Sequence, residues 1–356
     1  MTLSREDRDA PAGQEDPVRE VWLLVAMCLG SGIVSVHATV VVPLLGLISE
    51  QVGATPHAVS WTLSANLLAA AVFTPLIGRL GDVFGPRAVI LWVLVVVLAG
   101  SLLCVIATSL PLLLVGRVLQ AGCYALFPLA VSVMRGASES RQLPVRLAVI
   151  SSMNMLGGLI GMIAAGVLTT DGGSYRDPLW LPVLLTAFAL VTSWWFVPRL
   201  PRARERARLD LGGAALLSVA LVLLLLPISQ GGRWGWGSPK ALSCFLASAL
   251  LLSVWVWWER NQPEPLVVVA QLARARVLIP HVSAFFVGMT MYLSMIVMIE
   301  FPQSPHDLTG YGFSSSLLEA TLIFMAPGAV LSLLVAPFLG HLGRVSLFAK
   351  PDGDGA

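Results

Sequence analysis

The segment Gly78-Arg79-Leu80-Gly81-Asp82-Val83-Phe84-Gly85-Pro86-Arg87 separates two long runs of residues that carry no charge. Residues 58–78 precede it and residues 88–116 follow it, without a single Asp, Glu, Lys or Arg. Each run has at least the roughly 20 apolar residues that an α-helix needs to cross a bilayer. The segment is therefore predicted to be a compact hairpin between two spanning helices. Its glycines permit a tight turn, and Pro86 suits the first turn of the second helix.

The composition indicates that membrane helices make up most of the chain. Of its 356 residues, 56% are apolar and only 12% are charged, whereas soluble domains carry about 25% charged residues. The sequence thus predicts an all-α polytopic membrane protein embedded in a lipid bilayer. The net charge of +2 does not indicate nucleic-acid binding, because the basic residues flank the apolar runs. The four cysteines lie inside apolar runs without CxxC spacing, so we expect no metal site.

Ten apolar runs bounded by charges, Pro or Gly are predicted to span the membrane. They cover residues 21–48, 58–79, 88–108, 110–134, 146–169, 178–197, 211–230, 240–258, 278–300 and 317–339. Residues 1–20 are polar and are predicted to form a disordered cytoplasmic tail. If the spans alternate in direction, 18 Lys and Arg residues lie on one side, three on the other, and Arg117 within a span. Positive charge gathers on the cytoplasmic side, so we expect a plasma (cell inner) membrane protein with both termini in the cytoplasm.

The charged segment and the helix before it resemble a known family. The pattern G-R-L-G-D-x-x-G-x-R follows Ser60-Trp61, Asn66-Leu67-Leu68-Ala69-Ala70-Ala71 and Thr74-Pro75-Leu76-Ile77-Gly78. This combination is similar to the loop between helices two and three of the major facilitator superfamily, in its fourteen-helix drug:proton antiporter branch. An internal repeat agrees with the resemblance, since Thr74–Gly81 is echoed by Ala336–Gly343 at a constant offset of 262 residues.

The resemblance implies a division of the chain into segments. Beyond the tail we expect an N-terminal six-helix bundle (21–198), a cytoplasmic basic linker (199–210), two linker helices (211–260), a cytoplasmic loop (261–277), the first two helices of a C-terminal half (278–343) and a tail (344–356). Four further helices are expected from the resemblance, so the chain resembles a family member truncated after ten helices. The resemblance also implies that the hairpin acts as a gating loop, through Gly78, Arg79, Asp82, Gly85 and Arg87.

Arg117 is the only Lys or Arg inside a predicted span and not at its end, and a guanidinium in lipid is costly unless it faces a cavity or a partner. Arg117, Gln120 and Tyr124 lie three and four residues apart, on one helical face. With Pro128 they resemble the R-x-x-Q-G-x-G motif of the family, which implies a role for Arg117 and Gln120 in proton coupling. The alternative is an arginine that snorkels to the membrane surface, because the helix begins about five residues earlier.

His37 stands near the middle of the first span, where the related branch commonly has the aspartate of D-x-T-I-V. A histidine titrates near neutral pH and can carry a proton, so His37 is a second candidate for proton coupling. The alternative is a neutral histidine that only donates and accepts hydrogen bonds. Thr39, two residues later, is an expected cavity or packing residue.

The fifth span carries small residues at four-residue spacing, a pattern that lets membrane helices approach closely. It resembles the antiporter signature G-x-x-x-G-P-x-x-G-G, although Met162 replaces the proline and Ala165 a glycine. Plain helix packing explains the pattern equally well. The residues expected to line a cavity or pack helices are Thr39, Trp61, Asn66, Tyr124, Asn154, Gly157, Gly161 and Gly166.

These features predict a transmembrane transporter that exports small organic compounds or drugs by alternating access in exchange for protons. The expected partners are a small-molecule substrate, protons and the bilayer, with the proton gradient as energy source and no cofactor. The alternative is a truncated, transport-inactive member of the same family. An enzyme is not expected, because the sequence contains no H-E-x-x-H or G-x-S-x-G motif and no paired carboxylates inside a span.

Overall fold

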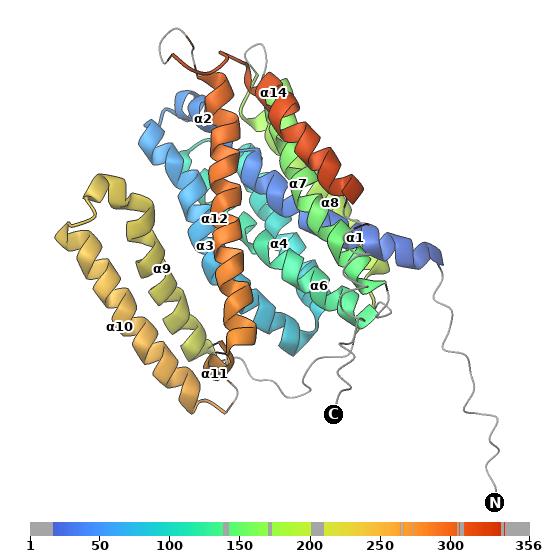
Figure 1. Cartoon of the computed structure of the whole chain (residues 1–356), viewed down its shortest axis with the longest axis vertical. Coiled ribbons are helices and arrows are strands. Elements are labelled where there is room, and N and C mark those ends of the chain that lie inside the picture. Colours follow the sequence, from blue (N-terminus) through green and yellow to red (C-terminus); the bar gives the residue numbers. More distant parts are fainter. Residues whose placement is uncertain are drawn as a thin grey trace, which may run out of the picture.

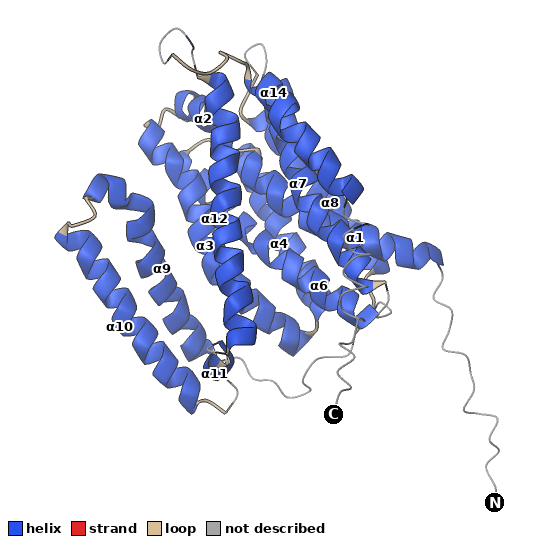
Figure 2. Cartoon of the chain, viewed as in Figure 1, coloured by secondary structure: helices blue, strands red, loops and turns tan. Residues whose placement is uncertain are grey.

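The computed structural model describes residues 17–137, 142–169, 173–200, 210–263, 265, 267–272, 274–304, 306, 310–335 and 338. Within these residues the structure is helical and contains no strand (Figure 2). The elements are α1 (Pro17–Thr39), η2 (Val42–Leu44), α2 (Leu45–Val52), α3 (Pro56–Phe84), α4 (Pro86–Ile106), α5 (Leu110–Gln120), η3 (Ala121–Ala125), α6 (Leu126–Ala137), α7 (Leu143–Leu168), α8 (Arg176–Phe196), α9 (Leu211–Trp234), α10 (Pro239–Asn261), α11 (Val269–Leu272), α12 (Ala275–Gln303), α14 (Leu317–Ala320) and η5 (Thr321–Met325).

The prediction of an all-α polytopic membrane protein is confirmed. Ten helical stretches in the described part of the chain are long and apolar enough to cross a membrane. They match the ten predicted runs one for one, from Val18–Val52 to Leu317–Val335. Many large apolar side chains point outward, among them Trp92 at 71% exposure and Leu184 at 64%. Outward apolar faces suit a lipid environment. In lipid every backbone polar group must also be satisfied inside the protein, and a helix does this within one segment.

The charged segment folds differently from the predicted hairpin. Helix α3 continues to Phe84, so Gly78 to Val83 are helical and the turn is confined to Gly85. Gly85 has φ of 88° and ψ of 144°, a conformation that glycine alone adopts readily. Pro86 then opens α4, as predicted. The prediction that several glycines form the turn is wrong, because the helical hydrogen bonding of α3 extends one turn beyond the apolar run.

Helix starts follow local capping rules. Thr55 accepts a hydrogen bond from the Ala58 amide at the start of α3, and Pro56 follows it. Ser238 accepts from the Ala241 amide at the start of α10, and Pro239 follows. A hydroxyl at the cap satisfies an amide that has no partner inside the helix, and proline at the next position loses no hydrogen bond. These caps set where two of the spans begin.

Helices α1 to α8 form a bundle (Figure 1). The bundle encloses two apolar clusters. One cluster joins α1, α4, α6, α7 and α8 around buried residues such as Met27, Val93 and Met134. The other joins the opposite ends of the helices with η2 and α2 around Leu44, Ile48 and Leu113. Between the two clusters lies a layer of buried polar side chains, which belongs to the site described below.

Helices α9 and α10 pair as an antiparallel hairpin that lies beside α3 (Figure 1). The Ser229 hydroxyl donates to Ser64 of α3 at 2.9 Å. At the other end of the hairpin Asp210 caps α9 through the Gly213 amide and accepts a hydrogen bond from Trp258 at 2.9 Å. Polar contacts thus hold α9 and α10 together at the open end of the hairpin. A hydrogen bond to α3 attaches the hairpin to the bundle.

The last spans lie on the outside of the bundle. Helix α12 is exposed along the membrane-spanning part of its length, whereas α14 and η5 pack on α7, with Leu318 against Gly166. Most of the linker 199–210 and nearly all of the echoed segment Ala336–Gly343, with the tail 344–356, lie outside the described residues.

Candidate functional site

Arg117 lies in the middle of the bundle, at a break in the fourth span. The α-helix α5 ends at Gln120, a 3₁₀ turn covers Ala121–Ala125, and α6 begins at Leu126. Arg117 is only 2% exposed and Gln120 only 1%. The guanidinium is therefore enclosed by protein, which contradicts the snorkelling alternative, since a snorkelling arginine keeps its charged group in water.

The Arg117 side chain connects three helices through its hydrogen bonds. Its Nε donates to the Thr62 carbonyl on α3 at 3.0 Å. Its Nη1 donates to the His37 carbonyl on α1 at 3.0 Å and to the Gln120 side-chain oxygen at 2.8 Å. In return, Asn66 of α3 donates to the Arg117 carbonyl at 2.7 Å. The acceptors on these bonds are neutral, so the dipoles of two carbonyls and one amide stabilise the positive charge, and the planar fork of the guanidinium lets it reach all three.

His37 joins the same network through a fourth helix. Its Nδ1 lies 2.9 Å from the Ile33 carbonyl, one turn earlier in α1. Its Nε2 lies 2.9 Å from the Ser101 hydroxyl oxygen of α4. The Gln120 amide also donates to this oxygen, at 3.2 Å. His37 and Ser101 are both completely buried. We call the connected residues the polar core: His37, Thr62, Asn66, Ser101, Arg117 and Gln120.

The structure thus brings together all three residues predicted to act in proton coupling, His37, Arg117 and Gln120, with Asn66 beside them. Ser101 and Thr62 were not predicted. Ser101 is one hydroxyl inside the uncharged run 88–116, and the sequence does not indicate which face of that helix meets α1. Thr62 takes part through its backbone carbonyl, which leaves no signal in the side-chain pattern.

Helices α1 and α7 are joined by a second set of polar contacts. Asn154 donates to the Ser31 hydroxyl at 2.9 Å and accepts from Ser35 at 3.1 Å. Thr39 Oγ1 lies 3.1 Å from the Gly158 carbonyl. Because these groups bond one another across the interface, Asn154 and Thr39 hold the two helices together in this conformation.

The predicted small residues of α7 face α1 and α14. A side chain at Gly157 would meet the backbone of Gly32, and one at Gly161 would meet Thr39 and Val36. Gly166 faces Leu318 of α14. These contacts agree with the packing interpretation of the stripe, since small residues let helices approach closely in membranes.

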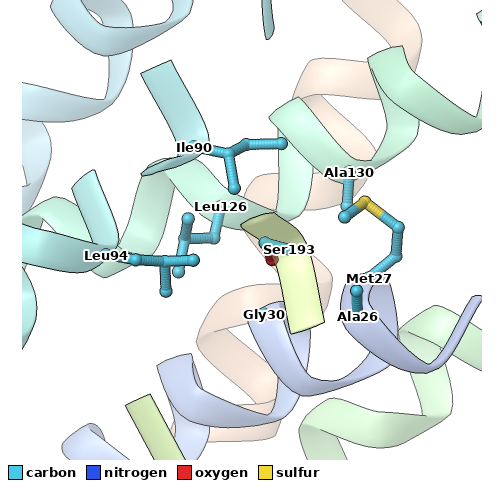
Figure 3. Close-up of a pocket in the computed structure, with 8 residues that line it drawn as sticks. All are labelled: Ala26, Met27, Gly30, Ile90, Leu94, Leu126, Ala130 and Ser193. Atoms are coloured by element: carbon cyan, nitrogen blue, oxygen red, sulfur yellow. The ribbon is translucent and has the colours of Figure 1, made fainter. Parts of the chain in front are cut away.

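Trp61 and Tyr124 are half-buried. Tyr124 lies in the 3₁₀ turn and packs against the cluster around Met27 and Met134. The bundle also contains a small pocket between α1, α4, α6 and α8, with space for about one water molecule (Figure 3). Its lining is apolar apart from Ser193. This pocket is too small to hold an organic substrate.

The predicted gating residues lie at one end of α3 and α4. Asp82 is exposed, whereas Arg79 is 8% exposed, and its Nε and Nη2 have no hydrogen-bond partner in the described part of the chain. Arg87 donates to the Trp194 carbonyl of α8 at 2.7 Å. Gly81 approaches Leu129 of α6 closely. The segment therefore touches α6 and α8, and Asp82 makes no ion pair within the described residues.

The described residues contain no group of three or more His, Cys, Asp or Glu side chains that could hold a metal ion. The four cysteines are free. The polar core offers hydrogen-bond donors and acceptors and a buried positive charge.

Comparison with known proteins identifies the family. The Major Facilitator Superfamily profile matches residues 27–349. An uncharacterized transporter of this type from Bacillus subtilis strain 168, YvkA, is 26% identical over 312 residues, which are 86% of this chain and 68% of that protein. The cephamycin export protein CmcT of Amycolatopsis lactamdurans is 32% identical over 64% of this chain and 47% of its own.

Multidrug resistance protein 3 of Bacillus subtilis strain 168 is 23% identical over 88% of this chain and 60% of its own. The matched regions thus span about half to two thirds of the length of these three relatives. The match of the family profile covers most of this chain, and its ten apolar helices are arranged as a multi-pass membrane protein. The chain belongs to the Major Facilitator Superfamily, a family of membrane transporters and not of enzymes.

Proposed function

We propose that the chain is a transporter of the plasma membrane that exports small organic compounds in exchange for protons. The observation that carries this proposal is the polar core, in which His37 and Arg117 are enclosed at the centre of four helices. Burying a charged guanidinium and a titratable imidazole side by side is expensive in a membrane protein. Such residues usually mark the path of a substrate, ion or proton.

The position of the polar core supports a role in alternating access. The core joins α1, α3, α4 and α5 by side-chain hydrogen bonds. If these helices move relative to one another, the bonds must exchange, so a proton taken up by His37 changes the relative free energy of the two arrangements. This is the coupling that a secondary transporter requires.

Export of organic compounds is supported by the names of two relatives, a cephamycin exporter and a multidrug resistance protein. In both, the matched region covers only part of the relative's length. The resemblance of the charged segment and of the small residues of α7 to the drug:proton antiporter branch also supports export of organic compounds. The excess of arginines on one side supports an orientation with both termini in the cytoplasm.

The test is transport by the purified full chain in liposomes. Two probes are used, ethidium as an organic cation and a cephalosporin as a β-lactam, each with an imposed pH gradient and with a protonophore as control. The proposal predicts movement of at least one probe against its concentration gradient, in exchange for protons, that stops when the protonophore is added. If neither probe moves and the lumen pH does not respond, the transport-inactive alternative is correct and the proposal fails.

A further inference from the structure

Ser101 occupies a place in the polar core that the transport proposal does not yet use. Its hydroxyl oxygen lies 2.9 Å from His37 Nε2, 2.8 Å from the Val97 carbonyl and 3.2 Å from the Gln120 amide nitrogen. A serine has one O–H donor and two acceptor lone pairs. The Gln120 amide can donate to one lone pair, and the single O–H can be donated either to His37 Nε2 or to the Val97 carbonyl, so the direction of each bond can be deduced by elimination.

Two of the directions are fixed by Arg117 and Ile33. Arg117 donates to the Gln120 oxygen, so the Gln120 amide must present its NH₂ group to Ser101. The Ile33 carbonyl can only accept, so His37 Nδ1 must carry a hydrogen. In the neutral imidazole, Nε2 then has no hydrogen and must accept one. The Ser101 hydroxyl is the group that donates it.

The same heavy atoms also satisfy the protonated imidazole. When Nε2 carries a hydrogen, it donates to the Ser101 oxygen, and the Ser101 hydroxyl turns to the Val97 carbonyl at 2.8 Å. Gln120 continues to donate to the second lone pair. Both imidazole nitrogens thus have a hydrogen-bond partner in each protonation state without displacement of any side-chain heavy atom. The difference is a rotation of the Ser101 hydroxyl, which points to Nε2 when His37 is neutral and to the Val97 carbonyl when it is charged.

We propose that Ser101 is the positioning residue that allows His37 to gain and release a proton within the closed bundle. This inference rests on the proposed proton-coupled function, because it explains which hydrogen-bond partner the proton-carrying residue has in each protonation state. A buried histidine without such a partner would leave either a lone pair or an N–H without a hydrogen bond, and the charged form would suffer more. Ser101 therefore sets the proton affinity of His37.

The charged groups around His37 are few. Arg117 faces it directly, through the bond to its carbonyl. Its positive charge repels a protonated imidazole, and it does so in every variant below. The titratable groups that interact with the guanidinium are Cys104, Cys123 and Tyr124. The neighbouring helices α3, α4, α6, α7 and α8 carry their other titratable groups near their ends, at His57, Arg79, Asp82, Arg87, Arg135, Arg146, Arg176 and Asp177.

The experiment follows the His37 imidazole by nitrogen NMR. The full chain is labelled with ¹⁵N-histidine, purified into nanodiscs and titrated from pH 4 to pH 9, with His37→Gln used to assign the signal. In the wild type we expect a neutral tautomer with hydrogen on Nδ1. In Ser101→Ala we expect the proton affinity of His37 to fall about tenfold, so the titration midpoint moves down by about one pH unit.

Two further variants separate this effect from a change in packing. Ser101→Thr keeps the hydroxyl and is expected to restore the midpoint to within about half a pH unit of the wild type. Ser152→Ala is the matched control, because Ser152 is a buried serine whose hydroxyl, among the described residues, bonds only the Val149 carbonyl of its own helix. If Ser101→Ala does not purify as a folded protein, Ser101→Cys replaces it, with a downward shift expected because a thiol is a weak partner.

An unchanged His37 titration in Ser101→Ala would overturn the proposal. An equal shift in Ser152→Ala would do the same, as would a wild-type His37 that does not titrate in this range. The failure of the transport proposal is distinguishable, since it would abolish proton-driven flux of ethidium and the cephalosporin while leaving the NMR difference between Ser101→Ala and Ser101→Thr in place.

Discussion

The guanidinium of Arg117 donates to the backbone carbonyl of His37 at 3.0 Å, so the one basic side chain in the middle of the bundle is bonded to the helix that carries the candidate proton acceptor. The same Nη1 atom donates to Gln120, whose amide reaches Ser101 and through it the His37 imidazole. Arg117 is thus connected to His37 in two ways. It bonds the His37 backbone carbonyl directly, and it reaches the His37 imidazole through Gln120 and Ser101.

The Arg117→Lys variant is expected to lose most of the contacts of the polar core. An ammonium cannot reproduce the fork that serves Thr62, His37 and Gln120 together, and hydrogen bonds to charged groups contribute about 1.5–3 kcal/mol each. We predict that the free energy of unfolding in an SDS titration falls by about 2–4 kcal/mol and that transport is lost. The matched control is Arg176→Lys, since the Arg176 guanidinium donates to one carbonyl among the described residues, that of Ala107. Equal stability of the two variants would contradict the prediction.

Contact between α1 and α7 depends on Gly157. A Cβ at this position would meet the Gly32 backbone, which cannot move aside without separating the helices. We expect Gly157→Ala to destabilise the bundle by about 1–3 kcal/mol, measured as a lower midpoint of thermal unfolding in detergent. Gly288→Ala is the control, because Gly288 is in the middle of α12 with open space around it, and its replacement should be neutral or slightly stabilising. A similar loss in both variants would show that the contact is unimportant.

The turn between α3 and α4 is expected to depend on Gly85 and not on Gly78. Gly85 has a φ of 88°, and an L-residue there is strained by about 1–3 kcal/mol. Gly78 is helical, and a Cβ added there would meet no other described group within 4 Å, so Gly78→Ala should be tolerated. We predict a lower unfolding midpoint for Gly85→Ala alone. A destabilised Gly78→Ala together with an unaffected Gly85→Ala would contradict this assignment of the turn.

The orientation in the membrane is tested by labelling single cysteines with a reagent that does not cross the membrane. The background replaces the four native cysteines, and a new cysteine is placed at Asp82 or at Gly232. Both residues are exposed and lie near the C-terminal ends of α3 and α9, which we expect on opposite sides of the membrane. We predict that Gly232→Cys reacts in intact cells and that Asp82→Cys reacts only after permeabilisation. The opposite pattern would reverse the assignment of the cytoplasmic side.

The ten spans were predictable because a bilayer imposes a length and a composition that the sequence shows directly. Arg117 was also predictable, since a charge within an apolar run requires an explanation. The reach of α3 to Phe84 was not, because charged residues such as Arg79 and Asp82 mark the end of an apolar run and not the end of a helix. Helical hydrogen bonds continue past the membrane surface until Gly85 and Pro86 interrupt them.

The partners of Arg117 were less accessible to sequence reasoning. Gln120 was found through its spacing of three residues, whereas His37 was chosen for its chemistry and Ser101 not at all. A contact between α1 and α4 depends on how the helices are rotated about their axes. The nearly uniform apolar faces of these helices do not specify that rotation, so the pairing of His37 with Ser101 emerges only from the packed bundle.

The central claim, that His37 couples proton movement to transport, is tested most directly by comparing two modes of flux in proteoliposomes. The wild type and His37→Gln are assayed for exchange of ethidium at equal concentrations on both sides and for its accumulation under an imposed pH gradient. We predict that His37→Gln retains exchange but loses accumulation, because glutamine can bond its neighbours but cannot carry a proton. Accumulation by His37→Gln at the wild-type level would contradict the claim.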